Sequence, residues 1–482
     1  MLGFLRLLLR PLEFTGRGGY FEICKLAWPL IIMGASNTIM QFIDRKFLSS
    51  LSTVAVAAAL PAGILYFSLF CVFLCTAGFT SAIVAQYHGA GDRKSVLSTV
   101  WSGVYFAAAS SLIIVFGLPL LGEWLIKLGG HSAELIELEN EYYMALIPSG
   151  ACACAAAPFF SFFSGRGKTL PVAIINIVSC LLNIPLNYVF IFGWGLFPPL
   201  EIMGAGLATS ICAMFSLVAI VVYFLLQPQN EYPTRSQRDP VWSCVVRLIR
   251  YGMPSGIQIA LDVGAFTLVT FSIGHLGSLA LAAHVIALSI NNMFFIPLLG
   301  LSEATAILTG QYIGRAKHAI ARSVAHRSWR LSALYMTLGG VVYLVFPVML
   351  AEMFGPEHER DQFQSVITMV RWLLAIAFMF NFCDTMKFVY TAALRGAGDT
   401  RAVMLISICS AYLLMVPGTL LLIWQFQASV ILVWLWLTSV AFIEGVLLVF
   451  RFRSGKWRFI RMIKPPEKIA RLDEYRFGPV QQ

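Results

Sequence analysis

The chain contains an internal repeat of strongly apolar sequence. Residues 29–89 align with residues 254–314 at a constant offset of 225 and without a gap. The matches include Pro29 with Pro254, and Gln86-Tyr87-x-Gly89 with Gln311-Tyr312-x-Gly314. A later echo, at an offset of 231, pairs Gly165-Arg-Gly-Lys-Thr169 with Gly396-Ala-Gly-Asp-Thr400. A duplicated apolar unit of this length predicts two similar lobes in a membrane, as in many secondary transporters.

Composition places the chain in a membrane. Hydrophobic residues make up 59% of it, charged residues 12%, and the mean hydropathy is +0.78. Soluble domains have about 45–50% apolar and about 25% charged residues. The apolar runs are about 20 residues long, which suits membrane helices and not the short alternating strands of a barrel. We therefore predict an all-α polytopic membrane protein.

Hydrophobic segments and polar breaks predict two six-helix lobes. The twelve predicted spans are 23–43, 54–85, 96–121, 142–163, 170–192, 203–226, 250–273, 279–311, 329–352, 366–393, 402–424 and 428–450. A polar, proline-containing stretch at 227–240 separates the repeats. The predicted parts are an amphipathic N-terminus (1–22), an N-lobe (23–226), a linker (227–249), a C-lobe (250–450) and a basic tail (451–482).

Basic residues cluster in alternate loops. They include Arg93, Lys94, Arg166, Lys168, Arg235, Arg238, Arg315, Lys317, Arg395 and Arg401. This pattern predicts that both termini lie in the cytoplasm, with the protein in the plasma membrane (the inner membrane of a bacterium). It also accounts for the net charge of +10, so no nucleic-acid partner is needed. The ten cysteines form no CxxC pair, and we expect them to act as small packing residues.

Charged residues inside the predicted spans are the main functional candidates. Placing a charge in the hydrocarbon region costs at least about 2.5–3.5 kcal/mol on insertion scales. The candidates are Asp44, Asp262, Glu303, Asp384, Lys387 and Glu444. For Glu303 and Glu444, near the ends of their spans, we expect anchoring or ion pairing with nearby arginines.

The strongest candidates are Asp262 and Asp384, in different helices of the C-lobe. Gln258 lies one helical turn before Asp262 and on the same face. The two acids could hold Na⁺ together with other oxygens, or they could share protons. The alternatives are a protonated structural carboxyl at Asp262 and an ion pair between Asp384 and Lys387.

The N-lobe carries a second polar stripe. Asn37, Gln41 and Asp44 share one helix face, and a later helix presents Asn176, Asn183 and Asn187 on one face. They predict either a second polar cavity or plain interhelical hydrogen bonds. Arg45 and Lys46 would reach the interface, or Arg45 would pair with Asp44. The sequence has no P-loop, HExxH, GxSxG or zinc motif, so we predict neither an enzyme nor an ATP-driven pump.

Several motifs resemble the multidrug and toxic compound extrusion (MATE) family. They are Asn183-Ile-Pro-Leu-Asn187-Tyr-Val-Phe-Ile-Phe-Gly193, Gly204-Ala-Gly-Leu-Ala-Thr209, Leu281-Ala-Ala-His284, Gly310-Gln-Tyr-Ile-Gly314, Leu394-Arg-Gly-Ala-Gly-Asp-Thr400 and Arg451-Phe-Arg-Ser-Gly-Lys-Trp457. The resemblance covers about residues 20–460. It implies twelve helices in two lobes and ion-coupled export.

The resemblance also implies roles for individual residues. Asp262 and Asp384 match acids implicated in cation binding in the Na⁺-linked branch, and Asp44 matches an aspartate implicated in coupling. Asn183 matches a fifth-helix asparagine. Asn187 stands where the branch with an N-lobe proton site has aspartate, which favours the C-lobe site and the NorM-like branch.

Positions 45, 46, 303 and 387 are usually uncharged in that family. Lys387 could act as a tethered cation that weakens Na⁺ binding, or favour an anionic cargo. Our prediction is a monomeric antiporter that exports a drug-like, cationic or amphipathic small molecule across the lipid bilayer in exchange for Na⁺ or H⁺, without another cofactor. The alternative is a flippase or exporter of an anionic or lipid-linked amphipathic substrate.

Overall fold

The computed structural model describes residues 16–194, 198–234, 241–354 and 360–463, and its regular elements there are helices. Those of the first half are α2 (Tyr20–Leu51), α3 (Thr53–Gly78), α4 (Thr80–Ala90), α5 (Arg93–Leu128), α6 (Ala133–Gly165), α7 (Thr169–Phe192) and α8 (Glu201–Leu225). Those of the second half are α9 (Trp242–Gly274), α10 (Ser278–Gly314), α11 (His318–Val345), α12 (Pro347–Glu352), α13 (Arg360–Ala397), α14 (Thr400–Cys409), a π-helix η1 (Ser410–Met415), α15 (Val416–Trp424), α16 (Val430–Arg453) and a 3₁₀ turn η2 (Lys456–Phe459). Most of the predicted N-terminal helix and tail, with Arg235 and Arg238 of the linker, lie outside the described residues.

Twelve long helical segments match the twelve predicted spans, since α3 continues into α4, and α14, η1 and α15 form one segment. Eleven of them are long and apolar enough to cross a membrane. The remaining segment, α11, is less apolar because its first half carries arginines and histidines. The predicted all-α polytopic membrane class is confirmed.

Several helices extend beyond their predicted spans, among them α2, α11 and α13. Helix α2 continues to Leu51, so Asp44 and its basic neighbours lie within the helix and not at its end. Helix α11 begins at His318, eleven residues before the predicted start. Helix α13 ends at Ala397, which places Arg395 in a helix and not in a loop. These helices continue through charged residues, whereas hydropathy alone ends a span at the first charge.

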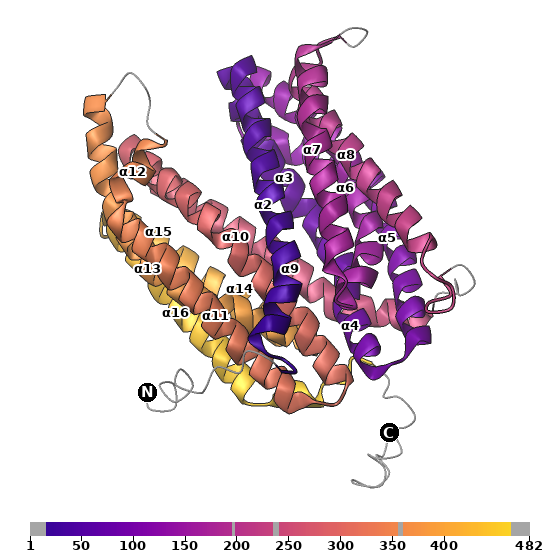
Figure 1. Ribbon diagram of the computed structural model, residues 1–482. Helices are drawn as coiled ribbons and strands as arrows, with labels where there is room; N and C mark the ends of the chain where they lie inside the picture. Colours follow the sequence, from indigo (N-terminus) through magenta and orange to yellow (C-terminus); the bar gives the residue numbers. More distant parts are fainter. Residues whose placement is uncertain (1–15, 195–197, 235–240, 355–359, 464–482) are drawn as a thin grey trace.

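The helices form two groups that splay apart at one end and converge at the other (Figure 1). Helices α2 to α8 make up one group and α9 to α16 the other, and α9 and α10 are the members of the second group that pack most extensively against the first (Figure 1). We call the convergent end, where α2 begins and α16 ends, the base. The splayed end carries the turn between α2 and α3.

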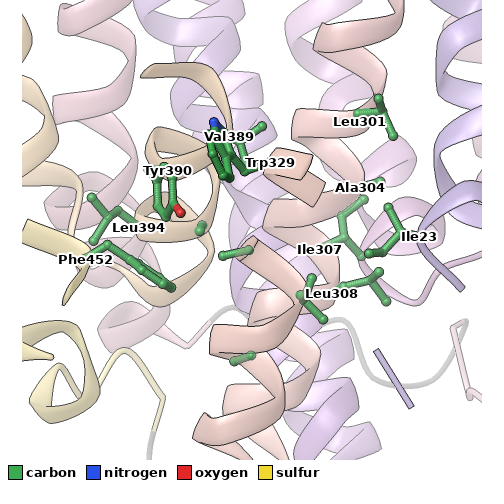
Figure 2. Close-up of a cluster of buried hydrophobic side chains, with 14 of the residues drawn as sticks. Ile23, Leu301, Ala304, Ile307, Leu308, Trp329, Val389, Tyr390, Leu394 and Phe452 are labelled. Atoms are coloured by element: carbon green, nitrogen blue, oxygen red, sulfur yellow. The ribbon is translucent and has the colours of Figure 1, made fainter. Parts of the chain in front are cut away.

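At the base the two groups share one buried apolar core. It contains Ile23 and Leu26 of α2 and Ala85 of α4, together with residues of α10, α11, α13 and α16. Figure 2 shows Ile23 beside Ile307 and Leu308 of α10. Burying this shared surface stabilises the association of the groups.

Glycines let helices of the two groups approach closely. A Cβ added at Gly256 of α9 would lie 2.6 Å from the carbonyl oxygen of Val72 in α3. One added at Gly300 of α10 would lie 2.9 Å from the backbone nitrogen of Ile31 in α2. Small residues at such crossings allow tight helix packing in membranes. The crossing with α3 fixes α9 just before Gln258 and Asp262.

Candidate functional site

Helix α9 presents Gln258 and Asp262 one turn apart, as predicted from their spacing. The Gln258 amide donates from Nε2 to Asp262 Oδ2 at 3.3 Å and to Ser407 Oγ at 2.9 Å. Gln258 is buried and Asp262 is half-buried. The amide of Gln258 thus connects Asp262 of α9 to Ser407 of α14.

The network continues to two charged residues on other helices. Ser407 Oγ donates to Glu444 Oε1 of α16 at 2.7 Å, and Lys387 Nζ of α13 lies 3.0 Å from Glu444 Oε2. The direct partner of Lys387 is thus a carboxylate of another helix, and Asp384 lies within electrostatic range of the same lysine. Glu444 does form an ion pair, but with this lysine and not with arginines at the helix end.

Arg395 is a further member of the site that hydropathy assigned to a loop. Its Nη2 donates to Gln258 Oε1 at 3.0 Å. The side chain reaches the site because α13 continues beyond the predicted span end. The hydrogen-bonded group Arg395, Gln258, Asp262, Ser407, Glu444 and Lys387 will be called the C-lobe network.

Asp384 of α13 is buried beside this network, within electrostatic range of Lys387, Glu444 and Asp262. The structure thus brings both predicted acids of the C-lobe into one charged region. Counted as ionised, the carboxylates of this region outnumber its two cations, Lys387 and Arg395, so the region lacks positive charge for neutrality. A buried carboxylate without a partner is costly, so a mobile cation or proton would stabilise the region.

The region is not sealed. The side chain of Lys387 is 22% exposed, and those of Asp262 and Arg395 are also only partly buried. Glu303 of α10, within electrostatic range of Arg395, is exposed although protein atoms surround it. Exposure of groups deep inside the protein is expected where helices leave an opening between them. In the described residues, three or more His, Cys, Asp or Glu side chains nowhere gather into a potential metal site, so a Na⁺ ion here would also need amide, hydroxyl or carbonyl oxygens.

The N-lobe residues form two smaller hydrogen-bonded groups. Asn187 donates to Asp44 and, at 2.7 Å, to Asn183 Oδ1, and both asparagines are fully buried. Asn37 Oδ1 accepts from Asn176 Nδ2 at 3.2 Å.

Gln41 and the two basic residues after Asp44 are exposed. Gln41 shares the helix face of Asp44 but takes no part in either of these hydrogen-bonded groups. Arg45 and Lys46 are also exposed, and the hydrogen-bond partner of Asp44 is Asn187. Within the predicted polar stripe, the carboxylate of Asp44 is therefore bound by the amide of Asn187.

This architecture defines the class: a multi-pass membrane transporter with a charged interior network. The MatE family model matches residues 29–189 and 254–421, so both parts begin at the prolines paired by the repeat. The chain belongs to the MatE family, whose members are transporters and not enzymes. The predicted resemblance and its NorM-like branch are confirmed.

Relatives and solved structures agree with this family. The chain is 26% identical over 453 residues to a probable multidrug resistance protein NorM from Thermotoga maritima, covering 94% of this chain and 96% of the relative. It is 30% identical over 408 residues to one from Pseudomonas aeruginosa, covering 83% and 82%. A structure described as the outward-facing conformation of a multidrug resistance MATE family transporter matches with a TM-score of 0.82 at 17% identity, covering 90% of this chain and 96% of that chain.

Proposed function

We propose that the protein is an antiporter that exports an organic, drug-like solute in exchange for Na⁺ or H⁺. The observation that carries the proposal is the partly exposed C-lobe network, where the carboxylates, together with Asp384 beside them, outnumber the cations. The names of the NorM relatives, as multidrug resistance proteins, support a drug-like cargo.

The coupling ion would act by neutralising the excess negative charge of the carboxylates in and beside the network. Asp262 and Asp384 would receive the ion, while Lys387, held by Glu444, supplies a permanent positive charge beside them. An ion can shift the balance between two conformations only by its difference in affinity for them. The hydrogen bonds from Gln258 and Ser407 link the carboxylates to α9, α14 and α16, so ion entry would alter how these helices pack.

The N-lobe would serve the cargo more than the ion. Its acid, Asp44, is bound by the amide of Asn187, at a position where a second carboxylate would suit proton exchange. The pair of Asn37 and Asn176 adds neutral donors and acceptors. Neutral polar groups suit the orientation of a drug-like molecule.

We propose that the base faces the cytoplasm, with both termini inside and the protein monomeric in the plasma membrane. Support comes from the basic residues in the loops and at the helix ends of this side, among them Arg93, Lys94, Lys168, Arg315 and Lys317. In that orientation the splayed end opens outward.

An anionic or lipid-linked cargo is the second candidate. Arg45 and Lys46 favour it, because both are exposed and lie next to Asp44. Lys387 supports it less, because its ammonium group already forms an ion pair with Glu444. Uptake of an anionic amphipath by vesicles of the purified protein, lost in Arg45→Ala with Lys46→Ala, would place this candidate first.

The test of the antiporter is exchange in inverted vesicles. A Na⁺ or pH gradient is expected to drive uptake of a cationic dye by the wild-type protein. Asp262→Asn and Asp384→Asn should each reduce the rate at least about tenfold, because each removes a carboxylate that receives the ion. Glu123→Gln, which alters a surface pair with Lys127, is the control and should leave the rate unchanged. Full gradient-driven transport by both aspartate variants would reject the mechanism.

A further inference from the structure

Two equivalent hydrogen bonds join the lobes at the base. Gln86 Nε2 of α4 donates to the carbonyl oxygen of Gly396 in α13, and Gln311 Nε2 of α10 donates to that of Gly165 in α6, each at 2.9 Å. The two glutamines are equivalent in the repeat, and so are the two glycines. The second contact is therefore the first with the lobes exchanged.

The tyrosines that follow these glutamines make a second equivalent pair. Tyr87 OH accepts from Arg247 Nη1 of α9 at 2.6 Å, and Tyr312 OH donates to Glu22 Oε2 of α2 at 2.7 Å. Glu22 and Arg247 are themselves 225 residues apart, so they are equivalent positions with opposite charge. A hydroxyl can both donate and accept, which lets the same residue serve both contacts.

The glutamine contacts are shielded from water. Gln86 is 1% exposed and Gln311 is 6% exposed, beside the apolar core that the lobes share. Glycines bring the backbones together here: a Cβ at Gly89 would overlap the carbonyl oxygen of Gln311, and one at Gly314 would overlap that of Gln86. Separating the lobes would leave buried amides and carbonyls without partners unless water entered.

We propose that these four hydrogen bonds are a latch that holds the base closed, and that the lobes must break all four to open this end. Because each bond has an equivalent on the other side of the pseudo-two-fold axis, a rotation of one lobe against the other stretches both members of a pair together. The latch then has two states, closed and open, without a stable half-open form. Its place in a transport cycle rests on the proposed function, but the closed base does not.

The latch predicts a measurable change in the distance between lobes. Lys94→Cys and Arg401→Cys introduce cysteines at two exposed positions of the base, one in each lobe. Spin labels attached to them report this distance by pulsed electron paramagnetic resonance. The exposed native cysteines, Cys24 and Cys409, are replaced by serine beforehand. No substrate or ion gradient is required, so the measurement stands even if transport differs from the proposal.

The decisive variant combines Gln86→Leu with Gln311→Leu, which keeps volume and burial but removes both donors. The population at long distance is expected to rise at least about fivefold over the wild type, since two buried carbonyls lose their partners. Gln425→Leu, at an exposed position outside the base, is the matched control and should not change the distribution.

A milder variant covers the case in which the glutamine variant does not fold. Tyr87→Phe with Tyr312→Phe removes only the two hydroxyls and should also raise the long-distance population, by a smaller factor. A distribution identical to the wild type in the tyrosine variant, and in the glutamine variant if it folds, would overturn the latch. A rise of equal size in Gln425→Leu would overturn it as well.

Discussion

At the scale of single residues, the ion pair of Lys387 with Glu444 has a large energetic consequence. Its atoms are 3.0 Å apart, and Glu444 is only 4% exposed. Removing one partner of a buried ion pair typically costs about 3–5 kcal/mol, because the other charge stays buried without compensation. Replacing both partners by neutral side chains costs much less.

This asymmetry gives a double-mutant cycle. Glu444→Gln and Lys387→Met should each lower the thermal unfolding temperature in detergent, and the double variant should be more stable than either single one. The measurement is thermal unfolding of all four proteins under one condition. Additive losses would show that the two charges do not stabilise each other, and that the pair is not what holds Lys387 in the network.

At the residue scale, contacts between residues of the same helix could be predicted, because their spacing can be read from the sequence. Gln258 and Asp262 lie one turn apart in the sequence, and their contact follows from helical periodicity. The partner of Lys387 could not be predicted, because Glu444 lies on another helix and meets it only after packing. Arg395 was missed because a charge at the end of an apolar run resembles a loop residue.

At the scale of elements, the segment from α14 to α15 is interrupted by the π-helix η1. Single π-turns inside helices are rare and often lie at functional sites. This one carries Tyr412, whose hydroxyl donates to the carbonyl oxygen of Leu261 at 3.0 Å, directly before Asp262. The extra residue per turn therefore brings a donor to the helix that carries the candidate ion site.

The packing of α15 against α16 depends on one glycine. A Cβ at Gly418 would overlap the ring of Trp436, whose Nε1 donates to the carbonyl oxygen of Leu414. Gly418→Ala is expected to destabilise the protein by about 1–3 kcal/mol through overpacking. Thermal unfolding measures the effect, with Gly117→Ala as the control, because its Cβ would meet only Ile113 at 3.7 Å. Equal unfolding temperatures for the two variants would contradict this packing.

Most helices could be predicted from the sequence because apolar runs of about 20 residues leave few other solutions in a membrane. Their ends could not, since α2 and α11 continue through charged residues that hydropathy assigns to loops. The π-helix also escaped prediction, because one added residue changes no hydrophobic pattern.

At the scale of the whole molecule, the orientation predicts which loops antibodies can reach. An epitope inserted after Gly130, between α5 and α6, should be labelled in intact cells, and one after Gln482 only once the membrane is made permeable. The reason is the excess of basic residues in the loops at the base. Labelling of the C-terminal epitope in intact cells would reverse the orientation and, with it, the direction of transport.

The matched contacts of Gln86 and Gln311 also say something about ancestry. A surface that meets its own copy, so that each patch serves as donor and acceptor at once, is the isologous contact of a symmetric dimer. The latch has this form inside one chain. Two identical half-sized subunits could have made the same interface before gene fusion. After such a fusion the two copies are free to diverge, and the opposite charges of Glu22 and Arg247 at equivalent places are an asymmetry that two identical subunits could not have.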